Sequence, residues 1–101
     1  MENVPVFQIG EIVEATKGRD HGKIYIVVGK FDDHFVAVAD GDQRTFKTAK
    51  KKNINHVRAL GFASREVKES LEQTGLVTNA KIRHGLIQYC REKPVIIKEG
   101  E

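Results

Sequence analysis

The chain has 101 residues, of which 31% are charged, and its formal net charge is +3 at pH 7. This length predicts one domain, or one small domain with an appendage, with a core of modest size. No stretch approaches the roughly 18 consecutive apolar residues of a membrane span, and the N-terminus lacks a signal-peptide pattern. Cys90 has no second cysteine with which to form an intrachain disulfide, so we expect a reducing, cytoplasmic setting.

Residues 1–60 predict a mainly β domain. Segments rich in Val, Ile and Phe alternate with turn residues, and five short strands are expected at residues 10–16, 23–31, 35–39, 44–48 and 54–60. The second of these is apolar on both faces, which indicates a central strand. Asp40-Gly41-Asp42 predicts a hairpin with a type I′ turn. Because no helix separates the strands, we expect a small, strongly curved antiparallel barrel.

Residues 61–101 predict a two-helix C-terminal extension. Ser64 is a suitable N-cap, and Gly75 a suitable stop, for a helix over residues 65–74. A second helix is expected from residue 78 or 79 to about residue 92, before Pro94, and residues 95–97 either add an edge strand or stay loose. The extension either packs on the barrel or binds a partner.

The second predicted helix has an apolar face that is interrupted by Gly85. We interpret this glycine as a site of close packing rather than a break in the helix. Cys90 is expected to be a small core residue beside the apolar face, which consists of Ile82, Leu86 and Tyr89.

The loop at residues 17–23 reads Lys-Gly-Arg-Asp-His-Gly-Lys and lies between two predicted strands. Its glycines let the backbone approach a ligand, and its cations neutralise phosphates. Asp20 is interpreted as a turn-forming residue rather than a ligand contact. The alternative is a plain turn in which the glycines only satisfy the backbone and the charges keep the loop soluble.

A second basic segment spans residues 44–58, with six basic residues and no acidic one. Three consecutive lysines cannot all face one way on a strand, so residues 50–52 are expected in a loop that follows a groove, or in a solvated linker. Reversing these lysines to glutamate is expected to abolish binding to a polyanionic partner without unfolding the barrel, since exposed charges contribute little to stability. Two basic segments on a near-neutral chain indicate a polyanionic partner.

These residues resemble a known motif. Gly10-Glu11-Ile12-Val13, the loop 17–23 and the apolar strand after it are similar to a KOW motif, with Gly22 at its marker glycine. That motif occurs in ribosomal large-subunit proteins and NusG-type transcription factors. Val38-Ala39-Asp40-Gly41-Asp42 and residues 50–57, Lys-Lys-Lys-Asn-Ile-Asn-His-Val, extend the match. Over residues 9–60 the chain therefore resembles KOW-type bacterial proteins related to large-subunit ribosomal protein fourteen of archaea and eukaryotes.

The resemblance implies an SH3-like barrel at residues 1–60 that binds RNA, ribosomal RNA above all. The chain is less basic than those ribosomal families and has a glutamate-rich helical tail, so a ribosome-associated factor fits it as well as a permanent ribosomal protein. We predict a non-catalytic, monomeric protein without cofactor or metal, whose RNA-binding residues are Lys17, Gly18, Arg19, His21, Gly22, Lys23, Arg44, Lys47, Lys50, Lys51, Lys52, Asn53 and His56.

Other functions stay open as alternatives. A NusG-like protein-interaction module, a general binder of double-stranded DNA and a subunit that dimerises through its second helix are each compatible with the pattern. No phosphate-loop sequence, catalytic constellation or metal-ligand spacing is present, which argues against an enzyme. The aromatic residues fall mostly at core positions, so recognition of folded RNA by shape and backbone is favoured over stacking along a free strand.

The RNA-binding hypothesis depends on one structural condition. The two cationic segments must lie together on the folded surface, and neighbouring carboxylates must leave their amines free.

Overall fold

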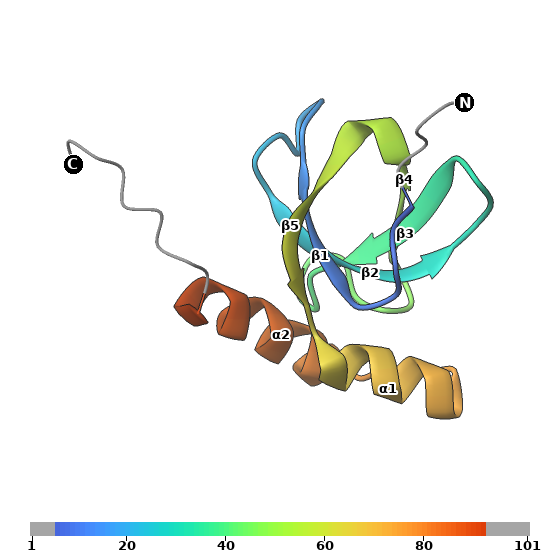
Figure 1. The fold of residues 1–101 in the computed structure, drawn as a ribbon, viewed down its shortest axis with the longest axis vertical. Coiled ribbons are helices and arrows are strands. Elements are labelled where there is room, and N and C mark those ends of the chain that lie inside the picture. Colours follow the sequence, from blue (N-terminus) through green and yellow to red (C-terminus); the bar gives the residue numbers. More distant parts are fainter. Residues whose placement is uncertain (1–5, 93–101) are drawn as a thin grey trace.

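The computed structural model describes residues 6–92 and shows a curved β-sheet with two helices packed on one side of it (Figure 1). The five strands are antiparallel and lie in the order β4-β3-β2-β1-β5. Their bounds are β1 Glu11–Ala15, β2 Ile24–Lys30, β3 Phe35–Ala39, β4 Lys50–Asn53 and β5 Val57–Ala63. A 3₁₀ turn at Ile54–His56 joins β4 to β5, and helices α1 (Arg65–Thr74) and α2 (Asn79–Glu92) follow.

The mainly β fold with a two-helix extension is thus confirmed, as a small SH3-like barrel that does not close. Its edge strands, β4 and β5, pair with β3 and β1 but not with each other in the described chain. Neither helix of residues 6–92 is long and apolar enough to span a membrane.

The concave face of the sheet encloses the barrel core. Alternate residues of each strand point inward, as the period-two pattern predicts. The buried cluster consists of Phe7, Val13, Ala15, Tyr25, Val27, Val36, Val38, Ile54 and Val57. β2 runs through the centre of the sheet and is buried on both faces, in agreement with its uniformly apolar sequence.

A second core lies between the outer face of the sheet and the helices. It consists of Ile12, Ile26, Val28 and Ala39 from the strands with Val67, Val77, Ile82 and Tyr89 from the helical region. Gly85 brings α2 close to the sheet, because a Cβ there would lie 2.8 Å from Ile26 Cδ1 and 3.0 Å from Ser64 Oγ. The expected close packing at Gly85 is confirmed, and the extension packs on the sheet.

The capping residues predicted from the sequence mark both ends of α1. The Ser64 hydroxyl accepts a hydrogen bond from the Val67 N–H at 3.2 Å and caps α1. Gly75 adopts a left-handed conformation and donates its N–H to Leu71 O at 2.9 Å, which ends the helix. The expected boundary at residue 60 falls inside β5, which runs to Ala63 and leads into α1 through Ser64 alone.

The fourth and fifth strands differ from the prediction. Residues 44–48 form no strand, and the lysine run that was expected in a loop is itself β4. Because β4 pairs with β3 through Val36↔Lys52 and Val38↔Lys50, the connection between these strands spans residues 40–49. The predicted type I′ turn is wrong, since Gly41 has positive φ but Asp40 and Asp42 do not.

Cys90, which was expected in the core, is exposed on α2. The aromatic residues were expected mostly at core positions, and Phe31 departs from this, being 56% exposed at the β2–β3 hairpin. Cys90 lies on the outer side of the helix because Ile82, Gly85 and Tyr89 define the buried face. The predictions for Pro94 and residues 95–97 fall outside the described residues.

Candidate nucleic-acid interface

The loop between β1 and β2, residues 16–23, has a backbone fixed by five hydrogen bonds, three of which shape its glycine turns. Gly22 N–H donates to Ala15 O at 2.8 Å, His21 N–H to Gly18 O at 3.1 Å and Lys23 N–H to Asp20 O at 2.8 Å. Gly18 and Gly22 have φ values of 82° and 92°, which favour glycine, and a Cβ on either would meet nothing within 4 Å. A ligand can therefore approach this backbone without obstruction.

The cations of this loop point into solvent. Lys17, Arg19, His21 and Lys23 are all exposed, and no ion pair holds any of them within residues 6–92. Lys23 Nζ donates a hydrogen bond to Gln43 Oε1 at 3.2 Å, which brings the loop into contact with the segment between β3 and β4.

The three lysines of β4 divide between the two faces of the sheet. Lys50 Nζ lies 2.5 Å and Lys52 Nζ 3.5 Å from Asp20 Oδ2, and the Lys52 side chain is only 10% exposed. Lys51 points to the opposite face, where its Nζ lies 4.6 Å from the ring centre of Phe35. The expectation of three solvated lysines along a groove is wrong, because the strand alternates them and one carboxylate binds two of them.

Asp20 also has a role other than the predicted one. It is not merely a turn-forming residue, since its carboxylate binds a neighbouring strand. The hydrogen bond from Lys50 lowers the pKa of Asp20 from 3.8 to about 2, against desolvation, with further help from the charges of Lys50 and Lys52 and a hydrogen bond from Tyr25. Burial, followed by the Asp20 charge, raises the pKa of Tyr25 to about 12.

The segment between β3 and β4 presents Arg44 and Lys47, both exposed. Asp40 Oδ1 accepts hydrogen bonds from the N–H groups of Asp42 and Arg44, at 2.8 and 2.9 Å, and so shapes the start of the segment. α2 also contacts this segment, since Arg83 Nη1 donates a hydrogen bond to the Gly41 carbonyl oxygen at 2.6 Å. Asn79 Oδ1 of the same helix accepts a hydrogen bond from the Phe46 N–H at 2.8 Å.

Asn53 and His56 flank the 3₁₀ turn. Asn53 Oδ1 accepts the Asn55 N–H at 2.8 Å, so this side chain caps the turn. His56 is exposed, and its carbonyl oxygen accepts the Thr16 N–H at 2.8 Å, which places it at the start of the glycine loop.

The structural condition is therefore met in part. The two basic segments touch through Asp20–Lys50 and Lys23–Gln43. Carboxylates occupy Lys50 and Lys52, and the neighbouring Arg58 pairs with Glu14 at 2.5 Å. The other lysine and arginine side chains of the two basic segments have no carboxylate partner within residues 6–92. They are Lys17, Arg19, Lys23, Arg44, Lys47 and Lys51.

Sequence reasoning missed Asp20 as a structural partner of the lysines. One signal was available: it is the single acidic residue between Glu14 and Asp32, in an otherwise cationic loop. A carboxylate in such surroundings is expected to have a cationic partner. The identity of that partner depends on how β4 pairs in the folded sheet.

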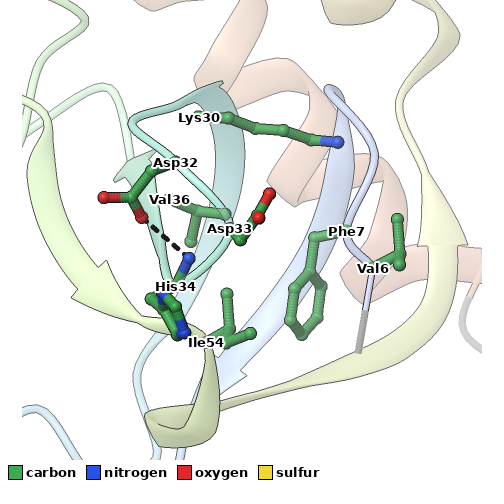
Figure 2. Close-up of a pocket in the computed structure, with 8 residues that line it drawn as sticks. All are labelled: Val6, Phe7, Lys30, Asp32, Asp33, His34, Val36 and Ile54. Carbon is green, nitrogen blue, oxygen red and sulfur yellow. Dashed lines mark hydrogen bonds between the residues drawn. The ribbon is translucent and has the colours of Figure 1, made fainter. Parts of the chain in front are cut away.

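A separate cavity of about 380 Å³ lies at the open end of the barrel (Figure 2). Phe7, Val36 and Ile54 give it an apolar lining, and Lys30 and Asp33 are among its polar residues. The hydrogen bond from His34 N–H to Asp32 Oδ1, at 2.7 Å, fixes the hairpin beside it. None of the predicted RNA-binding residues lines this cavity. Residues 6–92 contain no group of three or more His, Cys, Asp or Glu side chains arranged for a metal ion.

Acid should remove the stabilisation that the Asp20 ion pairs provide. Because the folded-state pKa is lowered, to about 2 from 3.8, this stabilisation is present at neutral pH and is lost as the pH falls from about 4 through about 2. Urea unfolding of the wild type and Asp20→Asn at pH 7, 4 and 2 measures it. The difference in unfolding free energy should be largest at pH 7 and small at pH 2. A difference that is independent of pH would contradict the ion-paired carboxylate.

Comparison with known proteins finds relatives of this chain among ribosomal and ribosome-binding proteins. No family model matches the chain. The Bacillus subtilis protein named "Putative ribosome-binding protein YbzG" is 41% identical over 70% of this chain and 96% of its own length. Large ribosomal subunit protein eL14 of Sulfolobus acidocaldarius is 31% identical over 72% of this chain and 84% of the relative.

The eL14 protein of Pyrobaculum islandicum extends the similarity, at 30% identity over 89% of this chain and 85% of the relative. These matches give no support to the NusG-like alternative. They agree with the resemblance to ribosomal protein fourteen that the sequence suggested, and they cover most of both the chain and its relatives. The chain belongs to the family of large ribosomal subunit protein eL14.

Proposed function

We propose that this protein is a non-catalytic, ribosome-associated factor of the cytoplasm that binds ribosomal RNA of the large subunit. The glycine loop at residues 16–23 and the segment at residues 40–49 together form the contact surface. The five exposed cations of these two segments, which have no carboxylate partner in residues 6–92, support this proposal more than any other observation. The names of the relatives, a ribosomal protein and a ribosome-binding protein, point to the same partner.

The mechanism is electrostatic docking on a folded RNA backbone. Lys17, Arg19 and Lys23 neutralise phosphates on one side, while Arg44 and Lys47 neutralise phosphates on the other. The open backbone at Gly18 and Gly22 allows N–H groups of the loop to approach phosphate oxygens. Such contacts position the RNA by its shape and charge and carry little sequence information.

The helical extension contributes to this surface indirectly. α2 packs on the outer face of the sheet and bonds the 40–49 segment through Arg83, so the position of Arg44 and Lys47 depends on the helix. This packing offers a function for the extension that needs no separate partner.

Salt dependence tests the electrostatic mechanism. About five phosphate contacts should give a plot of log affinity against log salt concentration with a slope of about −4. The measurement is cosedimentation with purified Bacillus subtilis large ribosomal subunits between about 50 and 300 mM KCl. An affinity that does not change with salt would contradict phosphate docking. Parallel samples treated with ribonuclease distinguish RNA from ribosomal protein as the contact, since the bound fraction should be lost with the RNA.

A further inference from the structure

Asp20 is a negative charge in the middle of the surface that is proposed to bind a polyanion. Its side chain is only 14% exposed and sits against Lys50 and Lys52. Electrostatics alone gives no reason for it, because the carboxylate cancels positive charge where RNA would dock. A residue that weakens long-range attraction in this way needs a compensating role.

The Asp20 contact links two parts of the chain that strand pairing does not join. The loop that carries it connects β1 and β2, whereas β4 is an edge strand that pairs only with β3. The backbone hydrogen bonds of the loop close it on itself or on Ala15, apart from the bond from Thr16 N–H to the His56 carbonyl oxygen at the start of the loop, and none of them reaches β4. Within residues 6–92, the side-chain bonds from this loop to residues 43–52 come from Asp20 and from the exposed Lys23–Gln43 pair. Asp20 is the less exposed and charge-assisted member of these two links.

We propose that Asp20 is a positioning residue of the interface: it anchors the loop to Lys50 and Lys52 and thereby holds Lys17 and Arg19 in the arrangement that binds phosphates. This inference rests on the proposed function. A loop with two glycines loses much conformational freedom when it binds, and a loop already fixed by an ion pair loses less. The entropy saved at binding compensates for the one positive charge that Asp20 cancels beside Lys50 and Lys52.

Asp20→Asn distinguishes a positioning role from simple charge cancellation, because the two roles predict opposite changes in affinity for the large subunit. The substitution removes one negative charge with little change of volume. If Asp20 positions the loop, affinity for Bacillus subtilis large subunits falls about fivefold to tenfold although the protein becomes more positive. If Asp20 only cancels charge, Lys50 and Lys52 become available, binding becomes tighter and the salt slope becomes steeper. Tighter or unchanged binding would overturn the positioning role.

Asp33→Asn is the matched control. Asp33 is an exposed acid of the β2–β3 hairpin, outside both contact segments, and its carboxylate makes no hydrogen bond or ion pair in the described structure. Its removal changes the net charge by the same amount without releasing a loop. Binding should stay equal or become slightly tighter, and a loss as large as that of Asp20→Asn would overturn the proposal.

Two further measurements distinguish a loosened loop from a general loss of stability. Amide hydrogen exchange of His21, Gly22 and Lys23 should accelerate in Asp20→Asn while the core strands keep their protection, which a general loss of stability would not produce. If Asp20→Asn fails to fold, Asp20→Glu serves in its place. This variant keeps the charge and should retain binding, and a folded Asp20→Glu that does not bind would overturn the proposal.

If reversing Lys17 and Arg19 abolishes binding while Asp20→Asn leaves it intact, only the positioning role fails. If that reversal has no effect, the proposed function itself fails.

Discussion

Reversal of two loop cations, Lys17→Glu with Arg19→Glu, is expected to lower the affinity for large ribosomal subunits by about a hundredfold or more. Each substitution removes a charge-assisted contact and adds a carboxylate that repels phosphate. The salt slope should become shallower by about 2, since two phosphate contacts are lost. Cosedimentation over a range of KCl concentrations measures both quantities. Stability should barely change, because neither side chain has an ion-pair partner within residues 6–92.

Arg65→Glu with Lys68→Glu provides the control for this reversal. Both residues are exposed on α1, outside the two basic segments, and the double substitution changes the net charge by the same amount. Binding should fall only slightly, through the general field of the protein. Equal losses in the two double variants would mean that net charge matters and that the glycine loop is not the contact.

The structure changes the expected effect of reversing the lysines at residues 50–52, which now includes a loss of stability. Lys50 and Lys52 reversed to glutamate would place two more carboxylates against Asp20, at a site where the Lys52 side chain is only 10% exposed. Like charges at such short distances disfavour the folded state. Reversing Lys50, Lys51 and Lys52 together is therefore expected to destabilise the fold around β4, so loss of binding in this triple variant would not identify an RNA contact. Lys17 and Arg19 are free of this ambiguity.

Local signals in the sequence were sufficient for the helices and for three of the strands. Ser64 and Gly75 mark the ends of α1 through hydrogen bonds to residues only three and four positions away. β1, β2 and β3 follow from the alternation of buried residues along each segment. These features depend on neighbours in the chain, so one sequence contains them.

β4 and the Asp20 contact could not be predicted in the same way. A run of Lys-Lys-Lys-Asn has low strand propensity, and it becomes a strand because β3 offers backbone partners and Asp20 binds the two lysines that face inward. Both partners are distant in sequence. The exposed positions of Phe31 and Cys90 have a similar cause, since the orientation of the hairpin and of α2 is set by packing between elements.

The contact between the 40–49 segment and α2 should make Gly41 intolerant of any side chain. Gly41 has a φ of 80°, and a Cβ would lie 2.7 Å from the Asn79 carbonyl oxygen and 3.1 Å from the Arg83 backbone nitrogen. Gly41→Ala is expected to lower the unfolding free energy by about 2–4 kcal/mol, from backbone strain together with a clash against a helix that cannot give way. Urea unfolding at neutral pH measures this loss.

Gly61→Ala isolates the steric part of that effect. Gly61 has a nearly equal φ of 77°, but a Cβ there would meet nothing within 4 Å, so its substitution costs only the backbone strain of about 1–2 kcal/mol. The extra loss in Gly41→Ala measures how tightly α2 holds the segment. Because Asn79 Oδ1 also accepts the Phe46 N–H at 2.8 Å, displacing this segment should move Arg44 and Lys47 and weaken ribosome binding. Gly61→Ala should leave binding unchanged. Equal stability losses in the two variants would show that α2 does not constrain the segment, and the extension would then have no part in shaping the RNA surface.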